Sequence, residues 1–219
     1  MGKANKFLMP SGMVGVLFYL AHTITGRLLW PEYDPITMDI SSLTAVGAPN
    51  AESVKRLTFV YGICMLLFAF AMIKKSFSQY HSLLKTGSVV FMIMQLTSIV
   101  GYGLFPLTGD KTEMNFQNRM HVIVTAVVVI TTIASAFLLA FGYLKQEKMK
   151  GLGKFTLALA VLITLFGALT PISMGLQLNI LGLTERLTIY SLQLLIFALS
   201  FVYTFLDNKG RDLKRSTKT

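Results

Sequence analysis

The sequence predicts an all-α integral membrane protein: a bundle of six transmembrane helices with both termini in the cytoplasm. Three observations predict this class. Of the 219 residues, 53% are hydrophobic and 14% are charged, whereas soluble domains carry about 25% charged residues. Six apolar segments each approach the ~20 residues that span a bilayer. The charged residues between these segments are distributed unequally over the two sides.

The six segments form one predicted domain over residues 1–208, followed by a basic cytoplasmic tail over 209–219. Before the first segment, Lys3 and Lys6 give the chain the start of a signal peptide, but no small-x-small cleavage site follows. We therefore expect the first helix to be retained. The predicted helices cover about 7–26, 53–73, 86–106, 119–143, 154–173 and 186–206.

The charge distribution predicts the orientation of the bundle. Fourteen of the twenty Lys and Arg and three of the ten carboxylates fall on the side of the termini, a net charge of about +11. The other side holds six basic residues and seven carboxylates, a net charge of about −1. Short cytoplasmic loops are enriched in Lys and Arg, so we expect a multi-pass protein of the cell membrane with cytoplasmic N- and C-termini.

The same distribution decides what the formal charge of +10 means. In a soluble protein it would suggest nucleic acid as a partner. Here the basic residues lie mainly in short loops and at the C-terminus, where they meet anionic lipid. We therefore expect membrane lipid and no nucleic acid as a partner, and we predict no oligomeric state.

The first outer loop, residues 27–52, contains the most unusual stretch, WPEYDPITMDISSLTAVGAPN, from Trp30 to Asn50. It holds three of the six prolines and the single tryptophan. Tyr33 is expected at headgroup level, and Asn50 is a suitable N-cap for the next helix. The apolar, β-branched middle predicts that the loop folds back onto the helices. It is either a rigid interfacial loop or the cover of a pocket.

Within the helices, few features suggest chemistry. Gln95 is expected to make an interhelical hydrogen bond. Gly101 is expected to allow close helix packing, and so is a stripe of small residues on the fourth helix. The fifth helix is expected to end at Thr170-Pro171. The stripe consists of Thr132, Ala136 and Ala140.

Seven residues able to do acid–base or metal chemistry fall near the predicted outer surface. The list is His22, Asp34, Asp39, Ser41, Asp110, His121 and Glu185. Three interpretations remain open. First, a metal ion could bind His22, His121, Asp110 and Glu185, although they come from separate segments and no short ligand spacing supports it. No cofactor is favoured.

Second, His121 could act as a general base oriented by Asp110 or Asp34, with Ser41 as nucleophile. Third, the charged side chains could form a structural network that holds the first outer loop against helices four and six. That network would consist of Asp34, Asp110, Arg119, Glu185 and Arg186.

Other site classes find no support in the sequence. The single Cys64 excludes a disulfide framework. No phosphate loop, dinucleotide fingerprint or HExxH motif occurs. No pair of broken helices of the kind used by transporters is visible.

Three stretches resemble a family of bacterial and archaeal six-helix membrane proteins, domain of unknown function family 998. They are PEYDPITMDISSLTAVGAPN (31–50), LFPLTGD (104–110) with the later His121, and GLTER (182–186). The resemblance covers nearly the whole chain and implies six helices but no established activity. It also implies a shared polar set: Tyr33, Asp34, Ser41, Asp110, His121, Glu185 and Arg186.

Our functional prediction is a protein that binds a lipid or small amphiphile in an outward-facing polar pocket under the 30–50 loop. One alternative is a membrane-embedded hydrolase or transferase that uses His121, Asp110 and Ser41, with or without a metal. A second alternative is a small transporter. The residues expected to bind the ligand are His22, Tyr33, Asp34, Arg119, Glu185 and Arg186, with His121 beside them.

Overall fold

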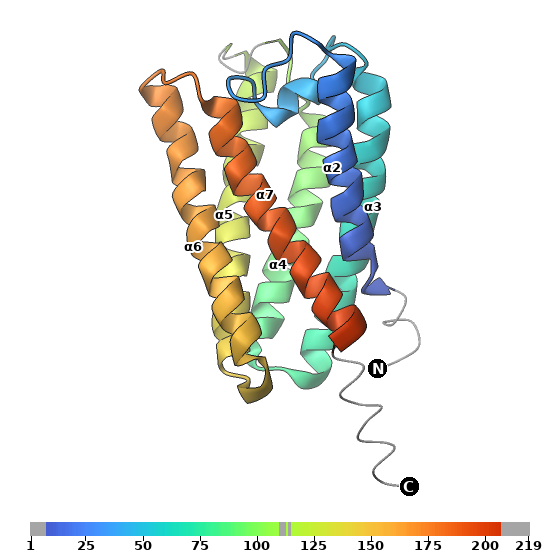
Figure 1. Ribbon diagram of the computed structural model, residues 1–219, viewed down its shortest axis with the longest axis vertical. Coiled ribbons are helices and arrows are strands. Elements are labelled where there is room, and N and C mark those ends of the chain that lie inside the picture. Colours follow the sequence, from blue (N-terminus) through green and yellow to red (C-terminus); the bar gives the residue numbers. More distant parts are fainter. Residues whose placement is uncertain (1–7, 110–112, 114, 207–219) are drawn as a thin grey trace, which may run out of the picture.

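Six long helices make up the computed structural model, which describes residues 8–109, 113 and 115–206 (Figure 1). All six are long and apolar enough to cross a membrane. This confirms the predicted all-α architecture with six candidate membrane helices. They are α2 (Ser11–Leu29), α3 (Ala51–Gln79), α4 (Ser82–Leu104), α5 (Phe116–Leu144), α6 (Lys150–Gly175) and α7 (Leu181–Phe201).

Most helices extend beyond the apolar segments that predicted them, because a helix continues through the headgroup region where polar residues are tolerated. The predicted end of the fifth helix at Thr170-Pro171 is wrong. Pro171 lies inside α6, which continues to Gly175. A proline removes one backbone donor, and membrane helices accommodate this through neighbouring polar groups.

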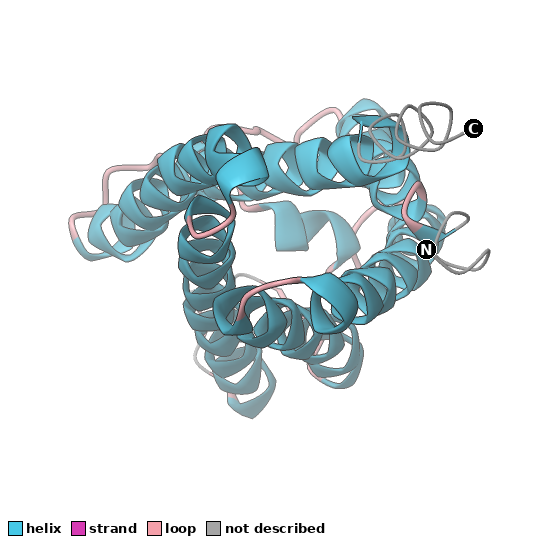
Figure 2. Cartoon of the chain, turned by 90° about the horizontal axis from the view of Figure 1, so that it is seen from below, coloured by secondary structure: helices cyan, strands magenta, loops and turns pink. Residues whose placement is uncertain are grey.

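The helices form a closed ring. Each packs against the next along the chain, and α7 packs against α2. Figure 2 shows the ring from below, with a short ribbon crossing its far end. That ribbon is the 3₁₀ helix η1 (Ile40–Thr44), which contacts α2, α3 and α7. The first outer loop thus contributes a helical turn that caps the ring.

The three connections predicted to lie outside do lie together. Residues 30–50, 105–109 and 176–180 occupy one end of the bundle, at the top of Figure 1, which we call the loop end. The opposite end carries the α3–α4 connection and the 3₁₀ helix η2 (Glu147–Met149). There the last helix also ends in a π-helical turn, η3 (Val202–Leu206).

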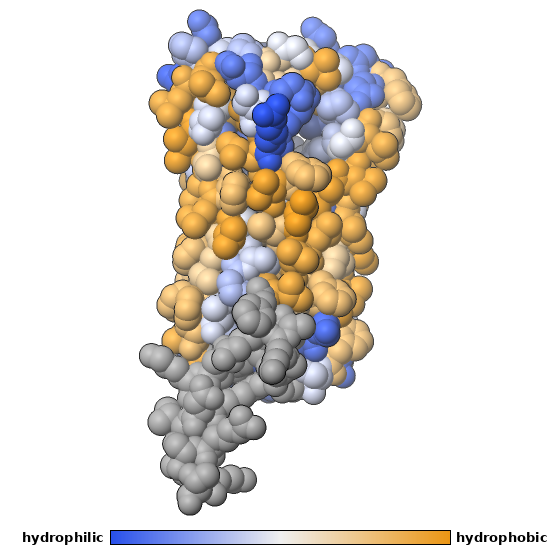
Figure 3. Space-filling view, turned by 90° about the vertical axis from the view of Figure 1, so that its right-hand side faces the viewer, coloured by the Kyte–Doolittle hydropathy of each residue, from blue (hydrophilic) through white to orange (hydrophobic). Residues whose placement is uncertain are grey.

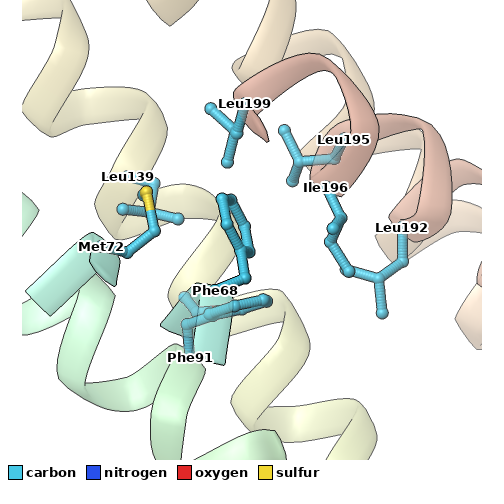
Figure 4. Close-up of a pocket in the computed structure, with 9 residues that line it drawn as sticks. Phe68, Met72, Phe91, Leu139, Leu192, Leu195, Ile196 and Leu199 are labelled. Carbon is cyan, nitrogen blue, oxygen red and sulfur yellow. The ribbon is translucent and has the colours of Figure 1, made fainter. Parts of the chain in front are cut away.

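Apolar side chains fill the interior in the half of the ring away from the loop end. Figure 4 shows the rings of Phe68 and Phe91 between Met72 and Leu139 on one side and four side chains of α7 on the other. The remaining space is about 10 Å³, close to the minimum for one water molecule. We call this layer the apolar plug.

The helices pack closely at the small residues for which the sequence predicted close packing. The stripe on α5 is buried. A Cβ on Gly101 would lie 2.6 Å from Val124, so this glycine permits α4 and α5 to approach. On the face that Figure 3 shows, the middle of the bundle is mostly apolar and polar side chains gather at the loop end, as expected of a lipid-facing surface.

Candidate functional site

The segment 30–50 folds back onto the bundle as predicted. Ile40 and Leu43 are buried, and Leu43 packs against α2, where a Cβ on Gly26 would lie 2.8 Å from its Cδ1. Tyr33 is only 1% exposed, so its ring packs inside the fold, and its position at headgroup level stays a prediction. Its ring is buried because its hydroxyl has partners inside the fold.

Those partners are backbone oxygens of the same segment and the guanidinium of Arg186. The Tyr33 hydroxyl donates to the carbonyl oxygen of Asp39 at 2.8 Å and lies 3.2 Å from that of Met38. It also accepts a hydrogen bond from Arg186 Nη2. Burial raises the pKa of Tyr33 to about 12, although the Arg186 charge acts in the opposite direction. The hydroxyl is therefore protonated at neutral pH.

Arg186 ties the segment to α7. Its Nη1 donates to the carbonyl oxygens of Pro35 at 2.6 Å and Met38 at 3.0 Å. It also donates to Gly182 of its own helix at 3.0 Å. The guanidinium lies 5.3 Å from the centre of the Tyr33 ring. Arg186 therefore joins the loop to the helix by donating hydrogen bonds to backbone oxygens of both.

The first turn of α7 completes this docking. The Leu183 amide donates to the Ile36 carbonyl oxygen at 3.0 Å, which satisfies one of the backbone donors that a helix N-terminus leaves open. The Glu185 Oε2 accepts the Ile40 amide at 2.7 Å. Glu185 and Arg186 therefore hold the loop, as the network interpretation predicted, but through hydrogen bonds to its backbone.

Two carboxylates shape the segment from within. Asp34 is exposed and accepts hydrogen bonds from the Ile36 amide at 2.9 Å and the Thr37 hydroxyl at 3.0 Å. The Ile36 bond is the main reason that the pKa of Asp34 is lowered. Asp39 is buried and accepts the hydroxyls of Ser41, at 2.6 Å, and Ser42. Ser41 thus donates to Asp39 at the start of η1.

Asp39 was missed as an organising residue, although its position before an ISS run is a recognisable N-terminal helix signal.

A second contact joins the segment to the α4–α5 connection. The Val46 amide donates to the Leu107 carbonyl oxygen at 2.8 Å, and Val46 forms an isolated parallel bridge with Thr108. Asn118, fully buried, accepts from the Thr108 amide at 2.9 Å and donates to its carbonyl oxygen at 2.8 Å. The sequence offered no signal for Asn118 beyond its amide side chain near a helix start.

His121 follows on the buried face of α5. Its Nδ1 lies 2.8 Å from the Phe105 carbonyl oxygen, and because a carbonyl oxygen only accepts, Nδ1 is the donor of this bond. The ring lies 4.9 Å from that of Tyr102. Arg119 is exposed in the first turn of α5. Asp110 lies outside the described residues, so its predicted pairing with His121 stays a prediction.

His22 lies deeper, on the inner face of α2. It is 3% exposed, and its ring packs edge-on against Tyr19 at 5.3 Å. Within the described part of the chain, no three His, Cys, Asp or Glu side chains come together as a metal site would require. The residues that do converge are Tyr33, Glu185 and Arg186, around the backbone of the 30–50 segment.

A groove opens beside this docked segment. Its volume is about 710 Å³, within the range of 300–1,000 Å³ typical of ligand sites. The 30–50 segment forms one wall, and the α6–α7 region forms the other. It is lined by Trp30, Thr37, Met38, Asp39, Ser42, Ala45, Val46, Ala48, Gly109, Ser173, Met174, Gln177, Asn179 and Leu181.

Comparison with known proteins identifies the family of this chain. A family model described as protein of unknown function (DUF998) matches residues 13–202. The chain belongs to this family. Searches of curated proteins and of solved structures found no significant match.

The three stretches that resemble the DUF998 family meet at the loop end. The 31–50 stretch docks on 182–186 through Arg186 and Glu185, and on 104–110 through the Val46–Leu107 bond. Most contacts join a side chain to backbone or backbone to backbone. Tyr33, Glu185 and Arg186 thus hold this end of the DUF998 protein together.

Proposed function

We propose that this DUF998 protein binds a lipid or small amphiphile at the loop end of the bundle, in the groove beside the 30–50 segment. The observation that carries the proposal is the groove itself: about 710 Å³, with polar and apolar walls from distant parts of the chain. An amphiphile needs both kinds of wall. Exposed Leu176 and Leu178 next to the groove are suited to an acyl chain.

The proposal changes the roles first expected of the polar residues. Arg186 and Tyr33 bond to the loop, and they support the wall without forming the ligand's polar site. The polar side chains that line the groove are Thr37, Asp39, Ser42, Ser173, Gln177 and Asn179. No Lys or Arg lines the groove within the described residues, which favours an uncharged or cationic headgroup over an anionic one.

The proposed setting is the cell membrane, with the loop end outside and both termini in the cytoplasm. The support is the charge difference between about +11 on the terminal side and about −1 on the loop side. An amphiphile would then reach the groove from the outer leaflet. Binding at this site requires no passage along the ring axis, which the apolar plug fills.

Filling the groove tests the proposal. The variants Ala48→Trp and Met174→Trp place an indole in the groove from its two walls. Native mass spectrometry and lipid extraction of the purified protein should show a several-fold loss of co-purifying lipid. Leu104→Trp is the matched control, because Leu104 is an exposed leucine at the loop end of α4 and does not line the groove. Equal lipid in all four proteins would contradict the proposal.

A further inference from the structure

A layer of polar side chains lies inside the ring, between the apolar plug and the loop end. On α4, Gln95 follows Phe91 by one turn on the same buried face. On α7, Gln193 precedes Ile196 by about one turn. Phe91 and Ile196 both line the plug, so Gln95 lies just above it. Gln193 lies at the edge of the plug nearest the loop end, next to Leu192. Because both glutamines are interior, neither reaches the water or headgroups outside the ring.

Tyr61 of α3 and His22 of α2 belong to the same layer. By a helical rise of ~1.5 Å per residue, all four residues lie roughly 10 to 18 Å below the loop-end termini of their helices. We call His22, Tyr61, Gln95 and Gln193 the inner polar layer. His22, Gln95 and Gln193 are each 2–3% exposed.

Contacts connect three of these helices through Tyr19. Gln193 Nε2 donates to the Tyr61 hydroxyl at 2.9 Å. The Tyr61 ring lies 4.9 Å from that of Tyr19, which packs against His22 at 5.3 Å. His22, Tyr61 and Gln193 therefore form one packed set, and Gln95 is buried on α4, which lines the plug together with α7.

Three atoms of this layer have no hydrogen-bond partner among the described residues: His22 Nδ1, Gln95 Nε2 and Gln193 Oε1. His22 interacts weakly with the backbone of Tyr19, but its Nδ1 makes no hydrogen bond of standard geometry. Buried polar atoms are nearly always hydrogen-bonded. An amide N–H and an amide oxygen left open on two facing helices call for a group that both accepts and donates.

We propose that the inner polar layer is a binding site for an uncharged hydroxyl group, carried by a free polyol or by the headgroup of a neutral lipid. A hydroxyl accepts from Gln95 and donates to Gln193, which no purely acidic or basic group does. A charge at this depth would need an opposite charge beside it. The charged groups above the layer, Arg186 and Glu185, are bonded to the 30–50 segment. This site is independent of the groove.

Nitrogen NMR of the full chain in detergent, with isotopically labelled histidine, tests the site. The probes are glycerol and monooleoylglycerol, and lysophosphatidic acid with the same oleoyl chain is the charged counterpart. We expect a saturable shift of the His22 signal with an uncharged probe and none with lysophosphatidic acid. His81, which opens α4 at the opposite end, is the internal reference and should not move.

Variants then separate specific binding from general effects. Gln193→Met and Gln95→Met should each weaken the response at least tenfold. Gln95→Met keeps the Gln193–Tyr61 bond and so remains a valid test if Gln193→Met does not fold. Ala48→Trp, which fills the groove, should leave the response intact. A failure of the groove proposal can therefore be told apart from a failure of the inner polar layer proposal.

Each outcome has a defined meaning. A response to glycerol supports a free polyol as the ligand, and a response to monooleoylglycerol alone supports a lipid headgroup. No response to either probe would show that the layer holds water only and would overturn the proposal. An equal response to lysophosphatidic acid, or an undiminished response in Gln95→Met, would overturn it as well.

Discussion

At the scale of the residue, the loop end shows polar side chains whose main partners are backbone atoms. Arg186 donates to two carbonyl oxygens of the 30–50 segment, and Glu185 accepts an amide of the same segment. A hydrogen bond to a charged group stabilises by about 1.5–3 kcal/mol. The 30–50 segment is therefore fixed in place through its backbone atoms as well as through its side chains.

Tyr33 provides a pH test of this arrangement. Its pKa rises from 10.0 to about 12 on folding, mainly through burial. A raised pKa means that the folded protein holds the proton more tightly than the unfolded chain. The stabilisation is therefore fully present below pH 10 and is lost as the pH rises from 10 to about 12.

We expect Tyr33→Phe to be less stable than the wild type by about 2 kcal/mol below pH 10, because its hydroxyl bonds are lost. The difference should shrink as the pH approaches 12. Chemical denaturation in detergent at a series of pH values measures it. Tyr190→Phe, which removes a hydroxyl bond to Thr23, is the control and should keep the wild-type decline. A difference independent of pH would refute the assignment.

At the scale of the element, the first turn of α7 is the docking surface for the 30–50 segment. A Cβ on Gly182 would overlap the Met38 carbonyl oxygen and lie 2.6 Å from that of Pro35. These are backbone atoms that Arg186 also holds, so they have little freedom to move. Glycine at 182 is what lets the segment approach the helix this closely.

Gly182→Ala should therefore lower the free energy of unfolding by about 2 kcal/mol and increase proteolysis within 30–50. The matched control is Gly103→Ala in α4, where a Cβ meets nothing within 4 Å. That change should stabilise by up to about 1 kcal/mol through helix propensity. Thermal unfolding in detergent and limited proteolysis measure both. Equal behaviour of the two variants would show that the close approach is not required.

At the scale of the whole molecule, the ring is stratified along its axis. The apolar plug closes one half, the inner polar layer lies above it, and the 30–50 segment caps the loop end. The groove opens beside this cap. Both proposed ligand sites thus lie on the loop-end side of the plug, and the side of the membrane that this end faces decides where the ligand comes from.

Cysteine labelling tests the proposed orientation. In a Cys64→Ser background, Val46→Cys reports on the loop end and Gly151→Cys on the opposite end. Val46 is 55% exposed, and a Cβ on Gly151 meets nothing within 4 Å. A membrane-impermeant maleimide should label Val46→Cys in intact cells and Gly151→Cys only after permeabilisation. The reverse pattern would place the termini outside.

The sequence by itself determined the number of spans and the grouping of the loops. Hydrophobicity is a sum over neighbouring residues, so each span could be predicted from its own segment. With six spans, alternate connections must lie on the same side, and the 30–50, 104–110 and 182–186 stretches were therefore expected together. The structure places them together at the loop end.

Only the tertiary structure decided what each polar residue does. Tyr33 and Arg186 were expected to bind a ligand, and Gln95 was expected to bond across helices. The structure instead bonds Tyr33 and Arg186 to backbone oxygens and leaves Gln95 Nε2 without a hydrogen-bond partner among the described residues. The physical reason is that backbone donors and acceptors are the same at every residue. Which of them a side chain meets depends on how distant segments pack.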